Sequence, residues 1–235
     1  EHGAKVDEDT ELVRIPGPVI EKYRALVPPT ITLRGRKAEF DVTFPRQLPV
    51  IATASSAPDI VDPVTGVTRR ATSGDIARIA HLVNELPGFD VFSISTLADD
   101  APPDQFSLSR FYPALKNCLK PVRTSVVDPR EAGQVLKLGE LIAGSKEAFW
   151  ERPFINFGYC SIVSPLTMDY DSTEMLMFYA ENDITAYGTI APMGGLSTPL
   201  TLAGMLTLMN AEWLAAATLA HGLPIHSPQS RLVPH

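Results

Sequence analysis

The chain has 235 residues and a formal net charge of -7, and 45% of its residues are hydrophobic. That share is enough for a substantial core, and a charged fraction of 20% argues against a disordered chain. The sequence contains no basic run, so nucleic acid is not expected as a partner. Residues 1–11 are polar and acidic and lack the apolar stretch of a secretory signal, which favours a cytoplasmic protein.

Residues 1–47 are predicted to form a short lead-in region. Gly17 and Pro18 open a helix over Val19–Leu26, because a proline suits the first turn of a helix. Ile31–Arg34 and Phe40–Phe44 alternate apolar and polar residues, as short half-exposed strands do.

From Leu48 onwards the pattern alternates between strands and helices, with a loop predicted over Ser55–Arg70. The predicted strands are Val50–Ala54, Val91–Leu97, Val122–Val127, Phe154–Val163, Thr185–Ala191 and Leu223–His226. The predicted helices are Ser73–Leu86, Asp104–Leu119, Pro129–Phe149, Ser172–Asn182 and Pro199–His221, with Thr72 or Ser73 as the cap of the first and Gly222 closing the last.

This alternation predicts an α/β fold with a parallel sheet and helices outside it. An open doubly wound sheet also fits, but no Gly-x-Gly-x-x-Gly follows the first strand, which favours a TIM-type (β/α) barrel over residues 48–235. The chain holds about six of the eight units that a closed barrel needs. We therefore expect a partial barrel, completed by further residues of a longer polypeptide or by another chain, and a homo-oligomer in solution.

The segment from Ala191 to Ala216 is the most informative part of the chain. Gly194 and Gly195 allow positive φ or a close approach to a ligand, and they follow a predicted strand. Thr198 is predicted as the N-cap and Pro199 as the first residue of the helix that follows. The apolar run Leu196–Ala220 includes Glu212, and a helix buried in a soluble fold fits it better than a membrane span.

Side chains at the carboxyl ends of predicted barrel strands are the candidates for substrate binding. They are Asp99, Tyr159, Ser164, Met193, Gly194, Gly195, Ser197, Thr198 and His226. An aromatic ring such as that of Tyr159 can stack on a methylammonium group, although core packing is the simpler interpretation. Asp99 could balance a cation, whereas solvation or helix capping is the simpler interpretation.

Several classes of chemistry lack their motifs. The cysteines, Cys118 and Cys160, form no closely spaced metal or redox pair and are predicted to be free thiols. No cluster of His, Cys and carboxylate residues has metal-site spacing, so no metal site is predicted. No Gly-x-Ser-x-Gly occurs, which disfavours a serine hydrolase of that type.

A series of short motifs resembles the trimethylamine methyltransferase (MttB-like) superfamily. These motifs are Gly3-Ala4-Lys5-Val6-Asp7, Val13-Arg14-Ile15-Pro16, Arg70-Ala71-Thr72-Ser73-Gly74-Asp75, Lys120-Pro121, Ser164-Pro165-Leu166, the Ala191–Ala216 segment and Gly222-Leu223-Pro224. Each motif is weak alone, but their order and spacing together are specific, and the matched region is similar to the middle of members about twice as long.

The resemblance implies transfer of a methyl group from trimethylamine, or from a quaternary amine such as glycine betaine, to the cobalt of a corrinoid (cobalamin). A partner protein would carry this corrinoid, and this chain would bind none covalently. The pyrrolysine of members that act on trimethylamine would align beyond His235. One alternative is a non-catalytic barrel segment that acts as a betaine-binding or assembly subunit. A weaker alternative is an unrelated barrel enzyme, such as a lyase.

Overall fold

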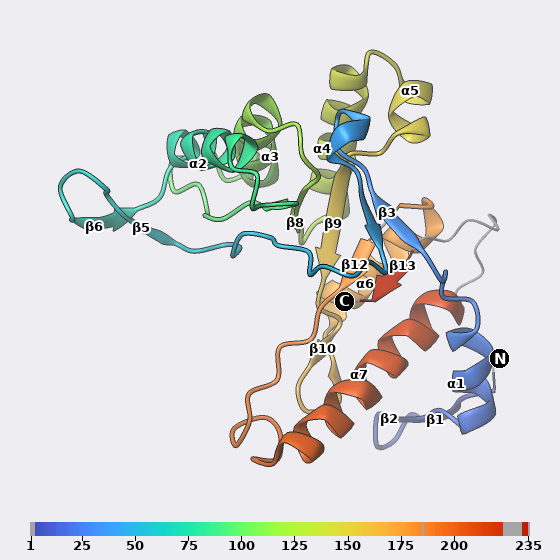
Figure 1. Ribbon diagram of the computed structural model, residues 1–235. Coiled ribbons are helices and arrows are strands. Elements are labelled where there is room, and N and C mark those ends of the chain that lie inside the picture. The colour runs from blue at the N-terminus through green and yellow to red at the C-terminus, as the bar shows by residue number, and fades with distance from the viewer. Residues whose placement is uncertain (1–2, 185, 223–231, 235) are drawn as a thin grey trace. The chain divides into compact units, whose positions relative to one another are not determined.

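The computed structural model of the chain describes residues 3–184, 186–222 and 232–234 (Figure 1). By internal contacts the chain divides into two compact units. Unit 1 comprises Glu1–Pro29 and Gly158–His235, and unit 2 comprises Thr30–Phe157. The predicted division at residue 47 does not coincide with this boundary and stays a prediction.

Unit 2 begins with a small antiparallel hairpin, close to the two strands predicted there. β3 (Ile31–Leu33) pairs with β4 (Val42–Phe44), and the one-turn helix η1 (Ala38–Phe40) lies between them. Leu33 and Val42 are buried and form a core cluster with Val91.

A second hairpin replaces the loop predicted over Ser55–Arg70. β5 (Asp59–Val61) pairs with β6 (Thr68–Arg70), and Figure 1 shows this hairpin projecting beyond the start of α2 (Ser73–Glu85). Asp62 Oδ1 accepts the N–H groups of Val64 and Thr65, both at 3.0 Å, and so closes the turn. The loop prediction was wrong because it rested on polar composition. The turn of a hairpin, closed here by an aspartate, has the same polar composition as an open loop.

The parallel sheet of unit 2 contains β7 (Phe92–Ser93), β8 (Val122–Ser125) and the first residues of β9 (Ile155–Tyr159). β8 lies between β7 and β9. The strand predicted over Val50–Ala54 is reduced to a single parallel bridge between Ala52 and Val91. The helices α2, α3 (Phe106–Asn117), α4 (Pro129–Ala143) and α5 (Lys146–Glu151) alternate with these strands.

The single helix predicted over Pro129–Phe149 is two helices. Gly144 ends α4 in the left-handed conformation at φ 91°, and Ser145 caps α5 by accepting the N–H of Ala148 at 3.1 Å. Glycine is the residue that adopts this conformation without strain, and serine is a favoured N-cap. The Gly-Ser pair therefore breaks the apolar periodicity.

Lys120, directly before β8, closes the carboxyl end of α2 in unit 2. Its side chain is buried, and Nζ donates to the carbonyl oxygens of Val83, Leu86 and Phe89 at 2.8, 2.6 and 2.7 Å. Burial lowers the pKa of Lys120 below its ordinary value of 10.5. The three hydrogen bonds that Nζ donates compensate the loss of water around the ammonium group.

Unit 1 combines the two ends of the chain. β1 (Lys5–Asp7) pairs with β2 (Leu12–Arg14), and α1 (Gly17–Arg24) follows. The long strand predicted over Phe154–Val163 is two elements, β9 and β10 (Ile162–Val163), and β10 turns back on β11 (Thr167–Met168) as an antiparallel hairpin. α6 (Tyr170–Glu181) begins two residues earlier than predicted, because Asp169 caps it by accepting the N–H of Ser172 at 2.9 Å.

The last elements of unit 1 are β12 (Ala186–Gly188), α7 (Leu202–Gly222) and β13 (Leu232–Pro234), and β13 pairs with β12 in parallel. Figure 1 shows α1 beside the carboxyl-terminal end of α7, where Ala216, Ala217 and Ala220 are buried. Gly222 lies inside the last turn of α7 and does not follow the helix as predicted.

α7 has an uneven environment. By length and composition alone it is long and apolar enough to cross a membrane. Of its most apolar 18-residue stretch, 22% is buried. Leu202 and Leu206, in its first turns, are exposed, whereas the second half is largely buried. The helix is therefore buried as predicted only towards its carboxyl end.

The chain is thus an α/β protein with a parallel sheet and several helices, as the sequence predicted. The described residues include no closed barrel. The strand predicted over Leu223–His226 lies outside the described residues.

Candidate functional site

Three groups of predicted site residues lie in unit 1, at the end of β9 and after β10 and β12. The first is Tyr159, the last residue of β9, whose carbonyl oxygen accepts the N–H and the hydroxyl of Thr189 at 2.9 and 3.1 Å. This bond places Tyr159 beside Gly188 of β12, on the same face of the sheet. A Cβ on Gly188 would lie 2.9 Å from Tyr159 Oη, so the glycine leaves room for the ring.

Tyr159 is 6% exposed, and burial raises its pKa above the ordinary value of 10.0. The hydroxyl is therefore protonated at neutral pH, where it can act as a hydrogen-bond group but not as a base. Its ring packs in the core of unit 1, and its role in binding stays a prediction.

The second group is the loop between β10 and β11, which is hydrogen-bonded to Glu212 of α7. Ser164 Oγ donates to Glu212 Oε2 at 2.7 Å, and the N–H of Leu166 donates to Glu212 Oε1 at 2.9 Å. Glu212 is fully buried, and Leu166 has a positive φ of 55°. The carboxylate thus fixes a strained turn, and it orients the Ser164 hydroxyl towards itself.

Sequence reasoning did not select Glu212 as a site residue. The signal was present, because a single glutamate within a long apolar helix must find hydrogen-bond donors if it is buried. The donors come from a loop more than forty residues earlier in the chain, so their identity required the structure.

The third group is the glycine loop, residues 191–201. The carbonyl oxygen of Met193 accepts the N–H groups of Leu196, Ser197 and Thr198 at 3.1, 3.0 and 3.1 Å. In return, Ser197 Oγ accepts the N–H of Met193 at 2.9 Å. Gly195 has φ 80°, which a residue with a side chain rarely adopts, and its N–H donates to Thr198 O at 2.9 Å. The loop is therefore a closed, internally bonded turn.

The predicted cap of α7 was wrong. The hydroxyl and N–H of Thr198 both bond to the Met193 carbonyl oxygen and so belong to the glycine loop. α7 begins at Leu202, and Thr201 Oγ1 accepts the N–H of Gly204 at 3.2 Å in the manner of an N-cap. Pro199 accordingly lies in the loop and not at the first helical position.

The remaining predicted site residues do not belong to these three groups. Asp99 belongs to unit 2, where its carboxylate lies 3.3 Å from Arg70 Nε in an exposed ion pair. His226 lies outside the described residues. Among the described residues, no hydrogen bond joins the Tyr159, Ser164 and glycine-loop groups to one another.

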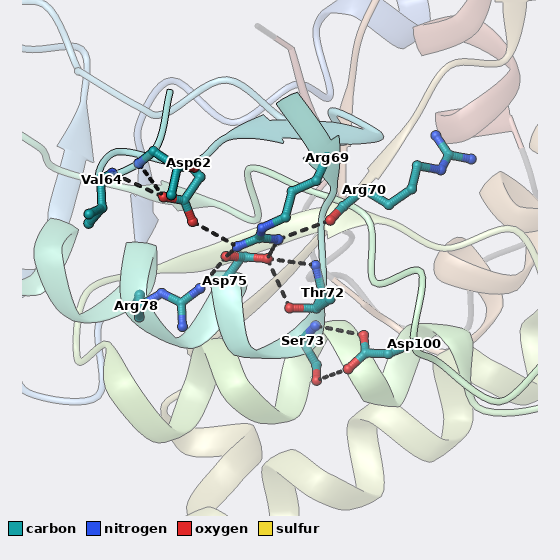
Figure 2. Close-up of polar contacts among 10 residues, drawn as sticks. Asp62, Val64, Arg69, Arg70, Thr72, Ser73, Asp75, Arg78 and Asp100 are labelled. Atoms are coloured by element: carbon teal, nitrogen blue, oxygen red, sulfur yellow. Dashed lines mark hydrogen bonds and ion pairs between the residues drawn. The ribbon is translucent and has the colours of Figure 1, made fainter. Parts of the chain in front are cut away.

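Asp75, the last residue of the motif Arg70–Asp75, lies in a charged cluster of unit 2, which Figure 2 shows. Asp75, 1% exposed, accepts two hydrogen bonds from Arg69 at 2.7 and 2.8 Å and a short one from Arg78. It also accepts the N–H and hydroxyl of Thr72 at 2.9 and 2.8 Å, which confirms Thr72 as the cap of α2. Asp75 therefore lies inside a complete set of donors at the start of this helix.

These donors set the charge of Asp75. The hydrogen bonds from Arg69, opposed by burial and joined by those from Thr72 and Arg78, hold the pKa of Asp75 far below its ordinary value of 3.8. Asp100 occupies the same helix end, where it accepts the N–H and hydroxyl of Ser73, both at 2.7 Å. The cluster is saturated with its own charges, so it acts as a structural unit.

Neither cysteine forms a disulfide. Cys118 is buried at the end of α3, and burial raises its pKa to about 11, which keeps the thiol protonated and unreactive. Among the described residues, no group of three or more His, Cys, Asp or Glu side chains is close enough to hold a metal ion.

The Glu212 contacts give a first prediction. Glu212→Ala should lower the free energy of unfolding by about 2–4 kcal/mol, because Ser164 Oγ and Leu166 N–H both lose their acceptor and a cavity forms. Glu212→Gln is the matched control. A carboxamide can accept from Leu166 N–H and donate to the Ser164 oxygen, so its cost should be near 1 kcal/mol or less. Chemical denaturation measures both; equal losses for the two variants would contradict the assigned hydrogen bonds.

Comparison with known proteins relates this chain to a family. The family described as trimethylamine methyltransferase (MTTB) matches residues 1–226. The chain is 27% identical to a trimethylamine methyltransferase of Desulfitobacterium hafniense over 220 residues, which are 94% of this chain and 44% of that protein. It is also 27% identical to a glycine betaine methyltransferase of another strain of that species, over 89% of this chain and 43% of that protein.

A trimethylamine methyltransferase of Methanosarcina mazei is 26% identical over 94% of this chain and 45% of its own length. The chain thus spans less than half the length of these curated relatives. The match nevertheless extends through both units and includes every motif on which the resemblance rested, up to residue 226. The chain therefore belongs to the trimethylamine methyltransferase family.

Proposed function

We propose that this protein is a corrinoid-dependent methyltransferase. It transfers a methyl group from a methylated amine or quaternary ammonium compound, of the trimethylamine or glycine betaine kind, to the cobalt of a corrinoid protein. The observation that carries this proposal is the family match over residues 1–226. The names of the relatives, trimethylamine and glycine betaine methyltransferases, support the substrate class.

We propose further that the chain supplies part of a TIM-type barrel. Parallel strands with a following helix in both units support this, as do the loops at the carboxyl ends of β9 and β12. In such barrels these ends carry the site. The lead-in region over residues 1–47, the cytoplasmic location and the homo-oligomer stay predictions.

In this proposal the protein binds and orients the methyl donor. The corrinoid, when its partner protein presents it, supplies the cobalt that accepts the methyl group. The glycine loop suits a surface that a partner must reach, because Gly194 and Gly195 carry no side chains and Met193 and Leu196 are exposed. Tyr159 is the last residue of β9 and Ser164 lies in the loop between β10 and β11, and we propose that both contact the donor.

A spectroscopic assay tests the proposal. The purified full-length protein, mixed with reduced cobalamin and one methylated amine at a time, should produce the absorbance change that accompanies methylation of the corrinoid. Trimethylamine, glycine betaine, proline betaine and carnitine form the panel. Turnover of at least one donor supports the proposal, and failure with all four, in a protein shown to be folded, would contradict it. Binding without turnover would instead favour a non-catalytic binding subunit.

A further inference from the structure

The three parallel strands of unit 2 are in a register that the hydrogen bonds define. Phe92 lies opposite Val122 and Ser93 opposite Arg123. The N–H of Val122 donates to Phe154 O at 3.3 Å, which sets Val122 opposite Ile155 in a parallel pair. Side chains of opposed residues point to the same face, and successive residues alternate. The side chains of β7, β8 and β9 therefore form rows across the sheet.

One face of these strands is covered by helices. Ile155 Cδ1 lies 2.9 Å from the position of a Cβ on Gly139 in α4. Two residues later on the same face, the ring of Phe157 lies 5.8 Å from that of Phe111 in α3. Phe92, Val122 and Ile155 all belong to this apolar, helix-covered face.

The opposite face carries a polar row. Ser93, Arg123 and Asn156 follow the apolar residues by one position in each strand, so they share that face and lie side by side. Ser93 and Asn156 are each 2% exposed. Arg123 Nε donates to Ser93 Oγ at 2.7 Å, which fixes the guanidinium in the row. Such polarity is unusual for the middle of a parallel sheet, whose strands are generally apolar on both faces.

Asn156 provides the observation that points to a ligand. Its Nδ2 is buried and has no hydrogen-bond partner among the described residues. A buried amide donor without an acceptor costs about 1–3 kcal/mol, so a native protein rarely keeps one without a reason. An acceptor brought by a bound molecule would satisfy it.

We propose that the row Ser93–Arg123–Asn156 binds the carboxylate of a small ligand. A carboxylate supplies the acceptors that the Asn156 amide lacks, and the Arg123 guanidinium supplies the opposite charge and planar donors. The next residues on this face, Ser95 and Ser125, are half-buried and exposed, so the row is approached from the carboxyl ends of the strands. The choice of ligand rests on the proposed function: the substrate is a methylated ammonium compound that also carries a carboxylate.

Isothermal titration with the full-length protein tests this with two ligands of similar size. Glycine betaine and choline share the trimethylammonium group, but only glycine betaine has the carboxylate. Wild-type protein should bind glycine betaine about 10- to 100-fold more tightly than choline, the range expected for hydrogen bonds to a charged group. Equal affinities, or tighter binding of choline, would overturn the proposal.

Three variants localise the effect. Arg123→Met should abolish the preference for glycine betaine while choline binds within about 2-fold of wild type, and Arg123→Lys should retain part of it. Asn156→Leu should weaken glycine betaine alone, by about 10-fold. Arg24→Met, which removes an exposed arginine in unit 1, is the matched control and should change neither affinity. If Arg123→Met weakens both ligands equally in a folded protein, the row is structural and the proposal fails.

The test separates this inference from the proposed methyl transfer. Demethylation of trimethylamine, without preference for carboxylated ligands, would keep the methyltransferase and overturn the carboxylate site. Binding of glycine betaine that depends on Arg123, without methyl transfer to any corrinoid, would keep the site and contradict the enzyme.

Discussion

Replacing Asp75 with asparagine should lower the free energy of unfolding by about 3–5 kcal/mol, because several hydrogen bonds to a buried charged group, each contributing about 1.5–3 kcal/mol, are lost or weakened. The amide can accept fewer hydrogen bonds than the carboxylate, and its NH2 group would face Arg69 and Arg78. Figure 2 shows that these two side chains and Thr72 converge on Asp75 from separate directions. Urea denaturation measures the change.

The same carboxylate predicts an acid sensitivity. The pKa of Asp75 is far lower in the folded protein than its ordinary value of 3.8. The contribution of its carboxylate to the free energy of unfolding is therefore fully present above about pH 5. That contribution is lost progressively as the pH falls below 4, where the unfolded chain binds the proton and the folded one resists it. Asp75→Asn should therefore flatten the fall in stability below pH 4.

Asp59→Asn is the control for both measurements. Asp59 pairs with Arg70 at 3.4 Å in the same unit, but its side chain is 46% exposed. An exposed pair of this kind contributes less than about 1 kcal/mol, so the control should be close to wild type. A similar loss for both variants, or an unchanged acid profile for Asp75→Asn, would contradict the account of the cluster.

Lys120→Met should also destabilise the protein strongly, by about 3–5 kcal/mol. Methionine fills most of the lysine volume, so the loss reports mainly the carbonyl oxygens of Val83, Leu86 and Phe89, which lose their common donor. Hydrogen exchange should locate the damage at the last turn of α2.

Lys116→Met removes an exposed lysine from α3 and serves as the comparison. It should change the free energy of unfolding by about 0.5 kcal/mol or less. If Lys120→Met lowered the free energy of unfolding equally little, the three hydrogen bonds from Lys120 to the carbonyl oxygens after α2 and in its last turn would not contribute significantly to stability.

Local signals in the sequence predicted only part of the local structure. Thr72 and Asp75 have the spacing of a capping pair, and the structure has that cap. Gly144 and Ser145 carry equally clear end and start signals, but the continuous apolar periodicity concealed the break between α4 and α5. Thr198 is a residue type that favours the N-cap position but is not the N-cap, because its hydroxyl and N–H both donate to the Met193 carbonyl oxygen and α7 begins only at Leu202.

Contacts between distant residues could not be predicted. The acceptors of Lys120 lie 31 to 37 positions earlier in the chain, and Ser164 is 48 positions from Glu212. Periodicity and propensity report only the neighbours of a residue along one element. The polar row of Ser93, Arg123 and Asn156 likewise depends on strand register, which a strand's own sequence does not reveal.

The central claim is methyl transfer from an amine to a corrinoid, and the fate of an isotopically labelled methyl group tests it most directly. The full-length protein is incubated with reduced corrinoid protein and with methyl-labelled trimethylamine or glycine betaine, and the products are identified by NMR. We predict that the label appears on the cobalt and that the demethylated amine appears in equal amount. Label that remains entirely on the amine, with a folded protein and an active corrinoid partner, would contradict the claim.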